Sequence, residues 1–152
     1  MLEVGTPAPA FELPNQDGEP IALSEFRGQR VVLYFYPRAN TDGCTTEACG
    51  FRDNWQAYRD RDITVLGVSD DPVSDLADFG ETYDLPFHLL SDADGTVSKQ
   101  YDSFGEKQMF GNTFEGVYRN TYVIDADGMI ERAYEGVDPE GHAETILADL
   151  SE

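Results

Sequence analysis

The amino-acid sequence predicts an α/β protein with a mixed central sheet flanked by helices. Two observations support this class: buried strands expected at 31–36, which is continuously apolar, and at 63–68, and a helix expected after each of them. Strands alternating with helices, then a hairpin and a last helix, are typical of layers packed on one sheet. Residues 1–152 show no repeat, linker or low-complexity block, so we expect a single domain.

The N-terminal part of the chain predicts a hairpin ahead of the first buried strand. Strand-like residues at 11–13 and 21–23 flank the turn sequence Asn15-Gln16-Asp17-Gly18. One helical turn is expected over 24–27. The apolar run 31–36 is rich in β-branched and aromatic residues, which favours a strand at the centre of the sheet.

Helices and strands are then expected to alternate to the C-terminus. Apolar residues at helical spacing predict a helix over 45–59 that begins near Cys44, and Asp70-Asp71-Pro72 favours the start of another. Residues 104–114 are interpreted as a loop punctuated by glycine. The remaining expected elements are a strand over 63–68, a helix ending at 83, a strand over 87–90, a turn at 93–95 into a brief helix, a hairpin of 121–124 and 129–134, and a helix over 139–150.

The charge of the chain excludes several classes of function. There are 30 Asp and Glu residues against 10 Lys and Arg, a formal net charge of −20. Because phosphate contacts need clustered Lys and Arg, we expect no nucleic-acid partner and no docking on anionic lipid. No apolar run approaches the roughly 20 residues of a membrane span, and the N-terminus lacks the pattern of a cleaved signal. We therefore expect a soluble cytoplasmic protein.

The acidic residues are spread along the whole chain rather than gathered in a tail. Such a surface repels itself in dilute buffer and is screened by salt. We therefore hypothesise a halophilic protein from a cell with a very salty cytoplasm, with a merely acidic protein as the alternative. A thermal melt in rising KCl separates the two.

The two cysteines, Cys44 and Cys49, carry the most informative pattern. Their spacing fits neither a C-x-x-C dithiol motif nor a four-ligand zinc site, and simple core packing is one interpretation. Cys44, however, follows a central strand and lies in the first turn of a predicted helix, at the sheet edge where ligands bind in open α/β folds. A helix N-terminus favours the thiolate, which is the reactive form of cysteine.

The loop before Cys44 adds two candidates. Thr41 can aim its hydroxyl at whatever the sulfur attacks, and Pro37 fixes the entry of the loop and removes one N–H donor. Pro37, Thr41 and Cys44 match the Pro-x-x-x-Thr-x-x-Cys motif of peroxiredoxins. Residues 43–53 (GCTTEACGFRD) resemble the bacterioferritin-comigratory-protein, or peroxiredoxin Q, subgroup.

This resemblance covers nearly the whole chain, from the opening GTPAPAF at 5–11 onwards. Residues 116–125 (GVYRNTYVID) look like the later strand of that family, which supplies an active-site arginine, here Arg119. The order of elements also resembles a thioredoxin-like fold with an N-terminal hairpin extension.

The resemblance implies a thiol-dependent peroxidase acting on hydrogen peroxide and organic hydroperoxides. Cys44 would be the peroxidatic cysteine, which becomes a sulfenic acid, and Cys49 the resolving cysteine, which forms a disulfide with it. Thr41 and Arg119 are candidate donors to the departing oxygen, and Arg119 would also favour the thiolate. The resemblance implies no metal, haem or flavin cofactor. It implies thioredoxin or a similar dithiol reductant, and a monomer rather than an oligomer.

Helix geometry constrains that disulfide. Five residues rise about 7.5 Å along a helix and leave the Cα atoms roughly 8–9 Å apart, whereas a disulfide needs them within roughly 7 Å. We therefore expect an intact helix in the reduced form and a locally unfolded one in the oxidised form.

Several residue roles stay open at this stage. Cys49 is either the resolving cysteine or a buried spectator, and Arg119 has a surface ion pair as its alternative. Glu47 either orients Arg119, caps backbone N–H groups or is a solvated acid. Asp42 departs from the usual loop of the family, as do residues 39–40, and it either disfavours the thiolate or caps the helix.

Other features are open or weak. The loop 104–114, with Met109 and Phe110, either borders the site, contacts a partner or packs normally. His88 and His142 are interpreted as a strand residue and an exposed helix residue rather than metal ligands. Two alternative functions remain, a thiol–disulfide carrier on the same fold and a non-enzymatic, cation-binding acidic protein.

Overall fold

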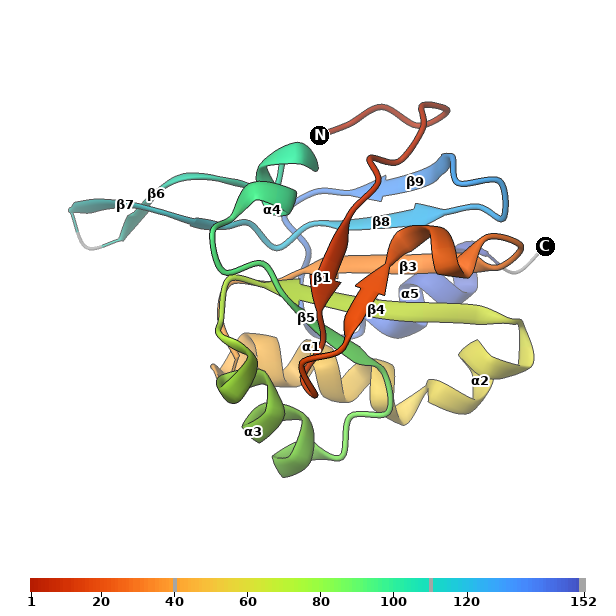
Figure 1. The fold of residues 1–152 in the computed structure, drawn as a ribbon, viewed down its shortest axis with the longest axis horizontal. Coiled ribbons are helices and arrows are strands. Elements are labelled where there is room, and N and C mark those ends of the chain that lie inside the picture. Colours follow the sequence, from red (N-terminus) through yellow and green to blue (C-terminus); the bar gives the residue numbers. More distant parts are fainter. Residues whose placement is uncertain (40, 110, 151–152) are drawn as a thin grey trace.

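A five-stranded mixed sheet forms the centre of the computed structural model, which describes residues 1–39, 41–109 and 111–150 (Figure 1). The strands lie in the order β5-β4-β3-β8-β9. β3 runs parallel to β4 and antiparallel to β8, β4 is parallel to β5, and β8 is antiparallel to β9. The strands are β3 (Arg30–Phe35), β4 (Ile63–Ser69), β5 (His88–Ser91), β8 (Thr121–Ile124) and β9 (Ile130–Tyr134). The predicted class and the central place of the 31–36 run are both confirmed.

Apolar side chains cover both faces of the sheet, and this explains the unbroken apolar run of β3. Val32 and Tyr34 point into one cluster, to which the long helices contribute, while Val31 and Leu33 point into another, which holds the N-terminal segments. The first cluster receives α1 (Asp42–Asp53), α2 (Trp55–Asp60), α3 (Val73–Tyr83) and α5 (His142–Asp149). The second receives β1 (Glu12–Pro14), β2 (Pro20–Ala22), the 3-10 turn η1 (Leu23–Phe26) and α4 (Thr96–Gln100).

Two predicted helices have different bounds in the structure. The helix expected over 45–59 is divided in two, because the backbone of Asn54 leaves helical geometry at φ −104° and ψ 11°, and it begins earlier, at Asp42. The last helix begins at His142 rather than at 139, because Gly141 adopts a left-handed conformation with φ 76°. None of the described helices is long and apolar enough to cross a membrane.

The prediction of a loop over 104–114 was wrong. β6 (Phe104–Met109) and β7 (Asn112–Val117) pair antiparallel as a separate ribbon that projects from the body of the protein (Figure 1). Because most of β7 is exposed to solvent, its sequence lacks the apolar alternation that marks a half-buried strand. Phe104 packs against the core and Phe114 is 43% exposed. Phe110 and the side chain of Met109 lie outside the described residues.

Candidate active site

Cys44 lies in the first turn of α1, just beyond the end of β3 at the edge of the sheet, as predicted. Its side chain is 1% exposed and its thiol is free. Thr41 is the residue at the helix N-cap, with extended backbone, and its carbonyl accepts the N–H of Thr45. The N–H groups of Gly43 and Cys44 therefore precede the first helical hydrogen bond and are available beside the sulfur.

Arg119 reaches the same place from the segment between β7 and β8. Its Nη1 donates to Glu47 Oε1 at 3.0 Å, and its side chain is 18% exposed. Burial opposes the charge of Arg119, but the neighbouring Cys44 and Glu47 outweigh it and raise the pKa of the guanidinium. A Cβ atom at Gly43 would lie 2.9 Å from Arg119 Nη2, so glycine at this position leaves room for the guanidinium.

Glu47 is buried, so the interpretation of a solvated acid is wrong. It comes from the second turn of α1, and its side chain has no exposed surface. Burial raises the pKa of Glu47 to about 7, against the opposing effect of Arg119. Its Oε2 has no hydrogen-bond partner among the described residues. Of the open alternatives, the structure favours Glu47 as the group that orients Arg119.

Thr41 does not present a proton to the site in this state. Its Oγ1 donates to the carbonyl of Arg38 at 2.9 Å. A hydroxyl carries one proton, so the remaining lone pairs of Thr41 can only accept. The expected donor role is therefore revised to that of an acceptor.

Asp42 is exposed and is the first residue inside α1, with no side-chain capping bond at this end of the helix. The alternative in which Asp42 caps the helix is therefore wrong, and Asn40 lies outside the described residues.

Pro37 is half-buried and borders a hollow of about 520 Å³ next to Arg119. Lys107, Tyr118, Asn120, Glu135 and Gly136 also line this hollow.

Cys49 lies in the same continuous helix as Cys44, half-buried and free. This agrees with the intact helix expected of the reduced form. Beyond Cys49 the helix packs on α5, where Gly50 faces Ala143 and the side chain of Asn54 donates to Glu144 at 2.9 Å.

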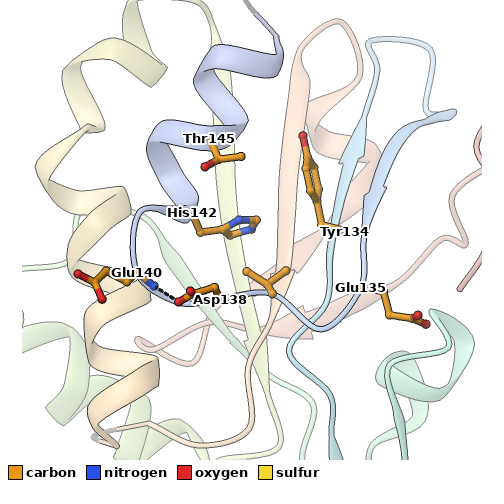
Figure 2. A pocket seen from close by; sticks show the side chains of 7 residues that line it. Tyr134, Glu135, Asp138, Glu140, His142 and Thr145 are labelled. Carbon is orange, nitrogen blue, oxygen red and sulfur yellow. Dashed lines mark hydrogen bonds between the residues drawn. The ribbon is translucent and has the colours of Figure 1, made fainter.

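The two histidines are placed differently from each other. His88 begins β5, as predicted. His142 is only 6% exposed, which contradicts the expectation of an exposed residue, and its Nε2 lies 3.0 Å from Thr121 Oγ1. It occupies the wall of a second hollow of about 280 Å³ (Figure 2). The spacing of His142 and the buried Ile146 on one face of α5 is the signal that predicts a buried histidine.

The sequence analysis assigned no role at the site to Asp71, although its carboxylate is buried close to the loop before Cys44. Asp71 was expected only to open a helix, but its Oδ2 accepts the backbone N–H of Ala39 in the loop before Cys44. In the described part of the chain, no group of three or more His, Cys, Asp and Glu side chains is placed to hold a metal ion.

Comparisons with known proteins agree with this arrangement. The AhpC/TSA family model matches residues 4–133. Peroxiredoxin Bcp of Escherichia coli K12 is 44% identical over 151 residues, which cover 99% of this chain and 97% of that protein. A putative peroxiredoxin of Mycobacterium tuberculosis H37Rv is 45% identical over 150 residues, covering 99% and 96%.

Solved structures show the same likeness over the whole chain. Peroxidoxin BcpB of Mycobacterium tuberculosis has a TM-score of 0.88 and 36% identity, covering 100% of both chains. A cysteine-to-serine variant of PrxQ from Xylella fastidiosa has a TM-score of 0.93 and 32% identity, covering 99% and 96%. The thioredoxin-like fold of peroxiredoxins is therefore confirmed. The chain belongs to the AhpC/TSA family, as a peroxiredoxin of the Bcp and peroxiredoxin Q group.

Proposed function

We propose that this chain reduces hydrogen peroxide and organic hydroperoxides with Cys44 as the nucleophile. The observation that carries the proposal is the position of the Arg119 guanidinium beside a buried Cys44 whose helix N-terminus still has free N–H groups. These donors converge on the place where negative charge develops when an oxygen departs. Pro37 lines the hollow next to Arg119 and carries no N–H.

The first step is a displacement at oxygen. The Cys44 thiolate attacks one peroxide oxygen, an S–O bond forms, and the O–O bond breaks. The sulfur is oxidised to a sulfenic acid, and the departing oxygen takes up a proton and leaves as water or an alcohol. Arg119 and the N–H groups of Gly43 and Cys44 stabilise the departing oxygen, while Thr41 Oγ1 accepts a hydrogen bond from the hydroxyl of the peroxide and so orients it.

The second step uses Cys49 as the resolving cysteine. Its thiol attacks the sulfenic acid of Cys44, the S–S bond forms, and water leaves. An external thiol then restores both cysteines by thiol–disulfide exchange and is itself oxidised to a disulfide. We assign this role to thioredoxin or a similar dithiol protein and expect the enzyme to act as a monomer.

Organic hydroperoxides belong to the proposal on chemical grounds and by comparison. The hollow beside Arg119 has room for an organic group attached to the departing oxygen. The bacterioferritin comigratory protein of Xanthomonas campestris, which was studied for alkyl peroxide reduction, has a TM-score of 0.90 and 30% identity to this chain.

Intact mass after one equivalent of hydrogen peroxide tests the proposal. We expect the wild type to lose two hydrogens, Cys49→Ser to gain one oxygen on Cys44, and Cys44→Ser to remain unchanged. Peroxide consumption by Cys44→Ser at the wild-type rate would contradict the proposal. A thiol–disulfide carrier on the same fold would show no peroxide turnover in any of the three proteins.

A further inference from the structure

The loop that carries Thr41 is anchored by a carboxylate from a different part of the chain. Asp71 follows β4, and its side chain is 2% exposed. Its Oδ2 accepts the backbone N–H of Ala39 at 2.7 Å and the hydroxyl of Ser69 at 2.8 Å. Ala39 itself lies outside any helix or strand and is 8% exposed, so the bond fixes an otherwise irregular stretch of buried backbone.

Asp71 and Thr41 bind opposite ends of one peptide group. The N–H of Ala39 and the carbonyl of Arg38 belong to the same peptide unit, whose N–H donates to Asp71 and whose oxygen accepts the Thr41 hydroxyl at 2.9 Å. A trans peptide is planar, and its N–H and C=O point in opposite directions. Fixing the N–H end therefore fixes the direction of the carbonyl to which Thr41 donates.

The direct hydrogen bond, rather than the nearby arginine, provides this anchor. Arg38 Nε lies 3.6 Å from Asp71 Oδ1, and the arginine side chain is 65% exposed. Because the guanidinium of Arg38 is largely in solvent and lies beyond hydrogen-bond distance, its contribution is small. A hydrogen bond from a backbone N–H to a buried carboxylate is short and strong, and its loss leaves the donor unpaired in the interior.

We infer that Asp71 is a positioning residue for peroxide reduction: it holds the Arg38–Ala39 peptide group and thereby sets the direction of the Thr41 hydroxyl beside Cys44. Thr41 and Cys44 belong to the same helical turn, so a rotation of this peptide group changes the orientation of Thr41 Oγ relative to the sulfur. The inference rests on the proposed function, in which Thr41 Oγ1 accepts a hydrogen bond from the hydroxyl of the peroxide.

Two rates of Cys44, both measured in a Cys49→Ser background, test the inference. Reaction with hydrogen peroxide needs an oriented Thr41, whereas alkylation by iodoacetamide needs only an accessible thiolate. We expect Asp71→Ala to lower the peroxide rate constant by about 10- to 100-fold, as misplacement of an orienting group does, and to leave alkylation near the wild-type rate. The double variant Asp71→Ala/Thr41→Val is expected to react with peroxide no more slowly than Thr41→Val alone. Asp71 acts through the orientation of the Thr41 hydroxyl, so its loss has no further effect once that hydroxyl is absent.

Asp92 offers a matched control. Its buried Oδ2 accepts the N–H and the hydroxyl of Ser98 at 2.7 and 2.8 Å, the same kind of bonding, but it holds α4 rather than the loop. Asp92→Ala is therefore expected to keep the wild-type ratio of peroxide rate to alkylation rate. Asp71→Asn, which keeps an acceptor for the Ala39 N–H, is expected to recover most of the peroxide rate.

Amide hydrogen exchange gives a readout even if Asp71→Ala does not fold. In the unaltered protein the N–H of Ala39 is expected to exchange slowly, although it belongs to no helix or strand. Free exchange of this amide, an equal fall of both rates in Asp71→Ala, or additive losses in the double variant would overturn the inference. Peroxide turnover by Cys44→Ser would instead overturn the proposed function, so the two failures are distinguishable.

Discussion

Glu47 and Arg119 form a buried ion pair beside Cys44, with 3.0 Å between Oε1 and Nη1. Glu47 belongs to α1, and Arg119 lies just before β8, which pairs with the central strand β3. The pair therefore fastens the helix that carries both cysteines to the sheet. Breaking such a pair leaves a charge uncompensated in the interior, so it resists opening of the first turns of α1.

The first prediction concerns the pH dependence of stability. Burial raises the pKa of Glu47 from 4.5 to about 7. The folded state therefore holds a proton that the unfolded state releases, and stability from this group is present below pH 4.5 and is lost as the pH rises through about 7. Between these limits we expect the wild type to lose on the order of 3 kcal/mol relative to Glu47→Gln. Urea unfolding at stepped pH measures this difference.

Glu81→Gln is the control for that experiment, because Glu81 is an exposed carboxylate on α3. This variant removes one surface carboxylate and leaves the pair of Glu47 and Arg119 in place. If Glu47→Gln and the wild type lose stability in parallel over the whole interval, the assignment of a raised pKa to Glu47 is wrong.

The second prediction concerns His142, which acts in the opposite direction. Burial lowers the pKa of His142 from 6.5 to about 4. The unfolded state therefore binds a proton that the folded state rejects, so stability from this group is present above pH 6.5 and is lost as the pH falls toward 4. We expect His142→Gln to lose less stability than the wild type over this interval. Urea unfolding at stepped pH measures this difference, and parallel losses in the two proteins would contradict the lowered pKa of His142.

Local signals explain which parts of the fold were predictable. The strand β3 followed from its apolar run, and the two predicted hairpins followed from turn residues between strand-like segments. The ribbon of β6 and β7 lacks such a signal, because it projects away from the core and most of β7 faces solvent. Its strands are defined by pairing with each other, which alternation of apolar residues does not reveal.

Contacts between distant residues explain what remained open at the site. Cys44 was placed by local pattern, since it follows a buried strand and opens a helix. The burial of Glu47 depends on Arg119, which is 72 positions away, and that of His142 involves Thr121, which is 21 positions away. Asp71 is 32 positions from the Ala39 N–H that it accepts. Such pairings follow from the topology of the sheet rather than from any window of sequence.

The third prediction concerns salt. The net charge of −20 is spread over the chain, so repulsion between carboxylates opposes the compact state in dilute buffer. KCl shortens the screening length to about 3 Å at 1 M, and we expect the melting temperature to rise by roughly 2–4 °C for each kcal/mol of repulsion removed. Thermal melts in increasing KCl measure this, with sucrose as an uncharged control. A melting temperature that is independent of KCl would contradict the hypothesis of an adapted acidic surface.

The fourth prediction concerns where α1 opens on oxidation. The half of the helix beyond Cys49 lies against α5, where Gly50 faces Ala143 and the side chain of Asn54 donates to Glu144. The half that carries both cysteines is fastened by Glu47 to Arg119. Because a disulfide cannot span five helical residues, we expect oxidation to unwind residues 42–49 only.

Hydrogen exchange of the reduced and the peroxide-treated protein locates this boundary. Amides at 44–49 should lose protection on oxidation, while those from Asn54 onward, still packed on α5, should keep it. Cys49→Ser forms no internal disulfide, so its helix should stay protected after the same treatment. Glu47→Ala removes the acceptor of the Arg119 hydrogen bond, which weakens the fastening, so its oxidised thiol should be resolved by Cys49 faster than in the wild type. A wild-type disulfide formed with protection unchanged at 44–49 would show that the helix does not need to open.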